Sequence, residues 1–166
     1  MKNKTASGLL LAILACLGVF GLAFFLWILP EALRMILDIS RFVEENRTMY
    51  HTFFYAWMGF AWAAAIPCYF ALFYAVRVAR RMGRGEAFSR ETARDIDRFA
   101  RCALIDACFV LAVNAAFLFL NLSHPGIFLL FVLVELFGAA VYILFRILAA
   151  YVLQAAALQE EQEWTV

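Results

Sequence analysis

Four long apolar stretches divide the chain, and they cover about residues 8–29, 53–76, 102–122 and 126–150. An α-helix needs about 20 consecutive apolar residues to cross the hydrocarbon core of a bilayer. The pattern therefore predicts an all-α integral membrane protein, a single domain over residues 1–166 with four transmembrane helices. Residues 123–126 between the last two stretches, Ser-His-Pro-Gly, predict a tight turn and an antiparallel helical hairpin.

The overall composition supports a membrane protein. Of the 166 residues, 66% are hydrophobic and 16% are charged, whereas a soluble domain is about half apolar and about a quarter charged. A single core of this size cannot bury such an excess, so lipid is its natural solvent. The formal net charge of +1 gives no reason to expect direct nucleic-acid binding.

The segment at residues 30–51, after the first span, is too long for a simple turn. Its apolar residues recur at roughly helical spacing among charges, at Leu33, Ile36, Leu37, Phe42 and Val43. This pattern predicts an outer interfacial helix on the membrane surface. Such a helix serves either as a cap over the bundle or as a ligand-binding lid.

The basic residues predict the orientation. Eight arginines lie in the loop at residues 77–101: Arg77, Arg80, Arg81, Arg84, Arg90, Arg94, Arg98 and Arg101. Lys2 and Lys4 precede the first span on the same side of the membrane. The positive-inside rule therefore places both termini, this loop and an acidic tail at residues 158–166 in the cytoplasm, with the spans in a bacterial inner (plasma) membrane.

A short amphipathic cytoplasmic helix is predicted at residues 90–101, leading directly into the third span. Ser89 is a good N-cap for this helix. Asp97 pairs with Arg101 at i,i+4, and two i,i+3 pairs, Arg94 with Asp97 and Asp95 with Arg98, are predicted on the exposed side. The arginines serve orientation and contact with anionic lipid, or a docking surface for a cytoplasmic partner. The candidate docking residues are Phe88, Ser89, Arg94, Arg98, Glu160, Glu161 and Glu163.

Four polar residues inside the spans are functional candidates: Asp106, Asn114, Glu135 and Arg146. Both hairpin helices rise about 1.5 Å per residue, so Asn114 lies level with Glu135, and Asp106 close to Arg146. Asp106 and Arg146 form an ion pair, or Arg146 extends to the headgroups instead. Glu135 bonded to Asn114 is a structural link, a proton or cation site, or a ligand contact.

Sequence motifs give no sign of an enzyme. The chain has no HExxH, GxSxG or nucleotide-binding glycine loop. Its four cysteines show neither CxxC nor metal-type spacing. We therefore expect a non-enzymatic protein with no cofactor and no bound metal.

Two short motifs carry a family resemblance. Residues 85–94, Gly-Glu-Ala-Phe-Ser-Arg-Glu-Thr-Ala-Arg, resemble the pattern G-x-P-F-S-x-E-N-A-R, and residues 160–166 are similar to an ending of the form E-E-N-D-L-T-I. These patterns and the layout of four spans are those of a YoaS-like family of uncharacterised bacterial membrane proteins, a domain of unknown function. The chain departs from the patterns at Ala87, where proline is usual, and at Trp164, where leucine is usual.

Members of that family are often encoded beside a small helix-turn-helix regulator. The resemblance implies a membrane protein that binds or controls a transcription factor through its cytoplasmic helix and acidic tail. The alternative is a small transporter, or an immunity or resistance protein, with a mid-membrane site at Glu135 and Asn114. The sequence leaves the oligomeric state open.

Overall fold

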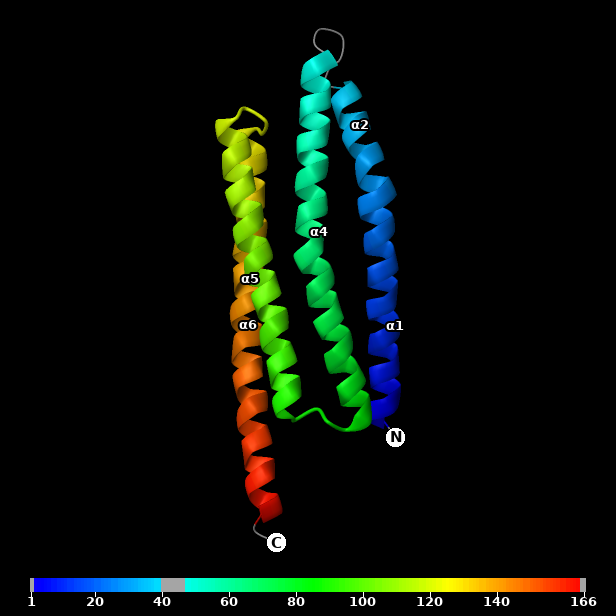
Figure 1. The fold of residues 1–166 in the computed structure, drawn as a ribbon, viewed down its shortest axis with the longest axis vertical. Helices are drawn as coiled ribbons and strands as arrows, with labels where there is room; N and C mark the ends of the chain where they lie inside the picture. The colour runs from blue at the N-terminus through cyan, green and yellow to red at the C-terminus, as the bar shows by residue number, and fades with distance from the viewer. Residues whose placement is uncertain (1, 40–46, 165–166) are drawn as a thin grey trace.

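The structure, a computed structural model, describes the backbone of residues 2–39 and 47–164 and the side chains of residues 4–36 and 50–162. This part of the chain is entirely helical, without strands (Figure 1). Four of its helical segments are long and apolar enough to cross a membrane: Lys4–Ile36, Tyr50–Arg84, Arg90–Phe119 and Pro125–Gln162. The fold therefore has the four membrane-length helices that the sequence predicts.

The first helical segment runs without a break through three elements. These are α1 (Lys2–Ala23), a π-helical stretch η1 (Phe24–Ile28) and α2 (Leu29–Ile39). The π-helical turn changes the backbone hydrogen-bond pattern, and the indole Nε1 of Trp62 donates a hydrogen bond to the carbonyl of Phe25 at 3.3 Å.

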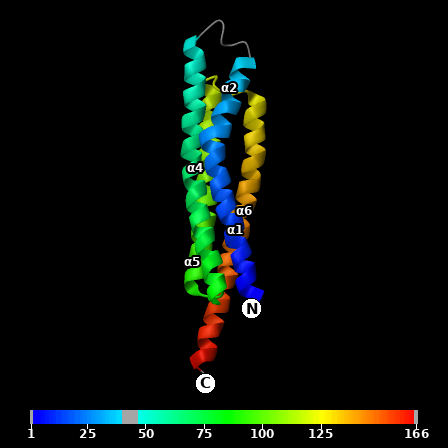
Figure 2. The same cartoon turned by 90° about the vertical axis from the view of Figure 1, so that its right-hand side faces the viewer.

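The predicted outer helix takes a different form. Figures 1 and 2 show α2 continuing the course of α1 beside α4, instead of lying across the end of the bundle. Leu33 on α2 is half-buried, while Ile36 is exposed. The other three residues of the predicted apolar stripe cannot be compared: the side chain of Leu37 and the whole of Phe42 and Val43 lie outside the described residues.

The second segment, α4 (Arg47–Arg84), contains Pro67 and packs along α1. Side chains donate hydrogen bonds across this contact to backbone carbonyls. Ser7 Oγ donates to the carbonyl of Ala79 at 2.6 Å, and the Tyr69 hydroxyl donates to the carbonyl of Gly18 at 3.0 Å. Small residues on the facing helices let the backbones approach closely enough for these bonds.

The last two segments form the predicted antiparallel hairpin. Helix α5 (Arg90–Phe119) ends three residues before the predicted end of the third span, and α6 (Pro125–Trp164) begins at the proline of the turn. Asn121 in this turn has a φ of 54°, in the left-handed region that asparagine tolerates better than most residues. Trp57 on α4 donates a hydrogen bond to the carbonyl of Leu122 at 3.0 Å, which ties the turn to α4.

The helices pack in the order α1, α4, α5, α6, and α1 does not contact α6 among the described residues. An aromatic cluster joins α4, α5 and α6. The centroid of the Phe60 ring lies 5.8 Å from that of Phe117 and 6.1 Å from that of Phe131. Both termini lie at the end that carries the loop between α4 and α5, and α6 extends beyond the other helices there (Figures 1 and 2). We call this end, residues 77–101 with the facing ends of α1 and α6, the basic end.

Candidate functional site

The start of α5 is built by the residues of the sequence motif at 85–94. Ser89 has an extended backbone and caps the helix as predicted, because its Oγ accepts a hydrogen bond from the Thr92 amide at 3.2 Å. The buried Thr92 hydroxyl donates to the carbonyl of Glu86 at 2.9 Å. Gly85 has a φ of 85°, which an L side chain rarely adopts. The motif thus encodes a sharp turn followed by a firmly capped helix.

Asp95, one turn further along α5, is the centre of an ion-pair cluster. Its side chain is only 1% exposed and lies 3.1 Å from Arg77 Nε and 3.5 Å from Arg81 Nη2, both on α4. Arg98 Nη1 lies 3.5 Å away on α5 itself, which confirms the predicted i,i+3 pair. The prediction that this pair faces solvent holds for Arg98, which is exposed, but it is wrong for Asp95, which packs against α4.

A second cluster joins α5 to α6. Asp97 pairs with Arg101 at 2.7 Å, as predicted, and also with Arg146 of α6. The proposed pair between Arg146 and Asp106 is therefore wrong: the long Arg146 side chain reaches along the bundle to a carboxylate nearer the basic end. The predicted contact of Arg94 with Asp97 is absent among the described ion pairs.

The far end of α6 is also held against the start of α5. Arg90 donates two hydrogen bonds to Glu160, from Nε at 2.9 Å and from Nη2 at 2.6 Å. This bidentate geometry is the strongest form of an arginine–carboxylate contact, although both side chains are about half exposed. The acidic tail is helical to Trp164 and forms the last turns of α6.

The candidate docking residues have different surroundings in the structure. Phe88 is 57% exposed beside the start of α5, and Arg94 and Arg98 are exposed. Ser89 serves as the N-cap, and Glu160 is bonded to Arg90. Glu161 lies on the exposed end of α6. The side chain of Glu163 lies outside the described residues.

A pocket of about 620 Å³ lies between α5 and α6 at the basic end. Five arginines line it: Arg90, Arg94, Arg98, Arg101 and Arg146. Between them lie Asp97 and the small or apolar side chains of Ala93, Ala149, Ala150 and Leu153. We call this the α5–α6 groove. Its positive charge suits an anionic group.

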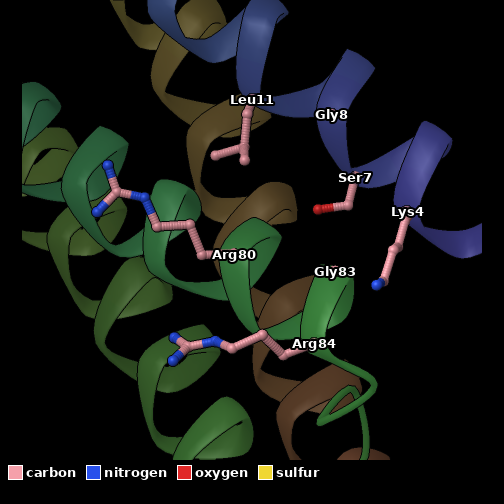
Figure 3. A pocket seen from close by; sticks show the side chains of 7 residues that line it. All are labelled: Lys4, Ser7, Gly8, Leu11, Arg80, Gly83 and Arg84. Atoms are coloured by element: carbon pink, nitrogen blue, oxygen red, sulfur yellow. The ribbon is translucent and has the colours of Figure 1, made fainter.

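A second pocket of about 510 Å³ lies between α1 and α4 at the same end. Lys4, Ser7, Arg80, Gly83 and Arg84 are among its lining residues (Figure 3). In Figure 3 the side chains of Arg80 and Arg84 point away from Lys4 and Ser7, so their charged groups do not converge on one point. This pocket is basic, but it lacks the facing arginines of the α5–α6 groove.

The polar residues inside the apolar segments form a different set of contacts from those predicted. Asn114 is fully buried and its Nδ2 donates to the carbonyl of Val110 at 3.0 Å, so its described bond is not to Glu135. The Cys68 thiol of α4 donates to Asp106 Oδ2 at 3.3 Å. Glu135 is half-buried on α6.

Cys68 was not among the residues predicted for this site, because cysteine within an apolar run is usually a small hydrophobic residue. The position after Pro67 was its one signal, since a proline within a helix frees a carbonyl and disturbs packing there. Buried oxygens of Asp106 and Asn114 have no hydrogen-bond partner in the described structure. No group of three or more potential metal ligands occurs among the described residues.

The fold and the basic end define an all-helical protein with four membrane-length helices, compatible with a multi-pass membrane protein. Residues 41–166 match the family described as "Protein of unknown function (DUF2975)", and the chain belongs to that family. The match includes the whole of α5 and α6 and both sequence motifs. The chain gives no match among curated proteins and none among solved structures.

Proposed function

We propose that the protein is a non-enzymatic, multi-pass protein of the bacterial inner (plasma) membrane that acts as a regulator or sensor through a cytoplasmic partner. On this proposal the basic end and both termini lie in the cytoplasm. The arginines of residues 77–101 support that orientation, since basic residues are enriched in cytoplasmic segments. Four apolar helices of sufficient length support insertion.

The observation that carries the proposal is the continuity of α5 from the basic end into the apolar part of the bundle. Asp95 joins its first turns to α4, while Asp97 and Arg90 join them to α6. A displacement of α4 or α6 within the membrane therefore moves the first turns of α5 and the residues that they expose at the basic end. To couple a signal in the membrane to the basic end, α5 needs two packed arrangements, and the signal must stabilise one of them more than the other.

The partner we propose is a small helix-turn-helix DNA-binding protein. Exposed Phe88 offers an aromatic anchor, and aromatic residues contribute strongly to binding at protein interfaces. Glu160 and Glu161 at the end of α6 present negative charge to a basic recognition helix, in competition with DNA phosphates. Binding through Glu160 would exchange its bond to Arg90 for one to the partner.

The test is affinity purification of the tagged protein from its native host in a mild detergent. We expect a small DNA-binding protein to be recovered with the intact chain and to be lost from a chain that lacks residues 160–166 and from Phe88→Ala. The matched control is Phe119→Ala, because Phe119 is 85% exposed at the opposite end of α5. Failure to recover a DNA-binding protein in several detergents, or recovery that is insensitive to both changes, would contradict the proposal.

A second candidate function is a small transporter, or an immunity or resistance protein. The observation that favours it is the hydrogen bond between Cys68 of α4 and Asp106 of α5, with the half-buried carboxyl group of Glu135 on the neighbouring helix α6. Ionisable residues within apolar helices often mark ion or proton pathways. Under this alternative, Glu135→Gln and Asp106→Asn abolish transport or resistance. The regulatory proposal instead predicts that both variants keep the partner.

A further inference from the structure

The α5–α6 groove has an excess of positive charge after its internal ion pairs are counted. Three carboxylates pair with its five arginines. Asp97 lines the groove, Glu160 pairs with Arg90, and Asp95, which packs against α4, pairs with Arg98. Arg94 forms no ion pair with any side chain that the structure describes. The groove thus retains guanidinium groups that can bind an anion, and guanidinium groups suit phosphate oxygens in particular.

Small residues give the groove its room. Ala93 of α5 and Ala149 and Ala150 of α6 lie between the arginines, so the helices leave a volume of about 620 Å³ there. A cavity of this size is within the range of sites that hold small organic molecules, about 300–1,000 Å³. The space therefore accommodates a phosphate together with the organic group attached to it.

The end of the groove nearest the apolar part of the bundle continues onto an apolar surface. Ile105 lies one helical turn beyond Arg101 on α5, and Ile143 lies one turn beyond Arg146 on α6. Both isoleucines are more than half exposed, at 60% and 56%. A ligand that fits this surface has an anionic group at one end and a hydrocarbon chain at the other.

We infer that the α5–α6 groove is a binding site for the headgroup of an anionic phospholipid. The phosphate lies among Arg94, Arg101 and Arg146, and an acyl chain follows the flank formed by Ile105 and Ile143. This site needs only the two helices and the bilayer, and it shares one lining residue, Arg90, with the contact that Glu160 would exchange for the partner. It is also distinct from the general attraction of basic residues to an anionic membrane, because it requires a shaped cavity.

Native mass spectrometry of the purified, full-length protein in a non-ionic detergent tests the inference. The protein is incubated with an equimolar mixture of phosphatidylglycerol and phosphatidylcholine, and the retained lipid is identified. We expect preferential retention of phosphatidylglycerol. Arg101→Gln should lower the affinity for phosphatidylglycerol about five-fold, and the double variant Arg94→Gln with Arg101→Gln should lower it about 25-fold. Each basic residue near an anionic surface contributes a similar increment of binding free energy.

Two further variants separate a built site from diffuse charge. Ala150→Phe fills the groove without changing its charge, and we expect it to abolish the preference for phosphatidylglycerol. Arg84→Gln removes an arginine from the same end but outside the groove, and we expect it to leave retention unchanged. Far-UV circular dichroism checks that each variant remains helical.

Three outcomes would overturn the inference. The first is equal retention of the two lipids, and the second is an equal loss for Arg84→Gln and Arg101→Gln. The third is displacement of phosphatidylglycerol by inorganic phosphate at millimolar concentration, which would assign the groove to a soluble anion. None of these outcomes depends on a protein partner, so the regulatory proposal stands or falls separately.

Discussion

Replacement of Asp95 by asparagine removes one negative charge from the most buried ion-pair cluster among the described residues and changes the side-chain volume very little. The Asp95 side chain is 1% exposed, and Arg81, which lies 3.5 Å away, is 15% exposed. The buried Nη1 of Arg81 has no hydrogen bond in the described structure. Asp95→Asn therefore leaves a largely buried guanidinium group without its counter-charge.

The loss of unfolding free energy depends on which of the arginines paired with Asp95 can reach solvent. Removal of one member of a buried ion pair costs about 3–5 kcal/mol. Arg77 and Arg98 are 37% and 51% exposed, so solvent screens their contribution. We therefore expect a loss near the lower limit, about 3 kcal/mol, which lowers the ratio of folded to unfolded protein about 100-fold.

The free energy of unfolding is measured by titration of the detergent-solubilised protein with sodium dodecyl sulfate, followed by circular dichroism. Asp97→Asn is the matched control, because Asp97 is 19% exposed and its partners Arg101 and Arg146 are 66% and 48% exposed. It should cost about 1 kcal/mol or less. If Asp95→Asn costs no more than Asp97→Asn, the cluster does not stabilise the packing of α5 on α4 and the reasoning is refuted.

Two further predictions concern local structure. Ser89→Ala removes the N-cap of α5 and should lower the free energy of unfolding by about 1 kcal/mol, as measured in the same titration. Gly83→Ala places a Cβ 2.5 Å from Ser7 Oγ and should destabilise the contact of α1 with α4 by about 1–3 kcal/mol, the usual cost of overpacking. Gly59→Ala meets no atom within 4 Å and should stabilise the protein by up to about 1 kcal/mol; equal effects at the two glycines would contradict the close approach.

The features that sequence could predict are those encoded by local pattern. The lengths of the apolar runs gave the four helices, and the turn residues before Gly126 gave the hairpin. Ser89 was identifiable as an N-cap because its residue type and position are specific for the start of a helix. The continuity of α5 through residue 101 followed from the helical spacing of apolar residues, which runs from the amphipathic segment at residues 90–101 into the third span.

Contacts between helices were harder to predict. Matching the heights of residues along the two helices of the hairpin placed Arg146 near Asp106. It ignored the length of the arginine side chain, which reaches Asp97 instead. The same matching placed Asn114 beside Glu135, whereas its amide bonds within its own helix. Levels along two helices say nothing about which way each side chain points around its helix.

The burial of Asp95 and the π-helical turn at Phe24–Ile28 were also beyond the sequence pattern. Asp95 lies among exposed charges of the same helix, and only the position of α4 with Arg77 and Arg81 makes its environment buried. The π-helical turn occurs within a uniformly apolar run, where no residue marks a change of helical pitch. Both features depend on neighbouring helices and not on local sequence.

Both the partner surface and the lipid groove require the basic end to lie at the inner face of the membrane. The most direct test labels single cysteines with a membrane-impermeant maleimide, after alanine replaces the four native cysteines. Glu86→Cys reports on the loop between α4 and α5, and His124→Cys reports on the turn between α5 and α6. We predict that His124→Cys is labelled in intact cells and Glu86→Cys only after permeabilisation; labelling of Glu86→Cys in intact cells would contradict the account.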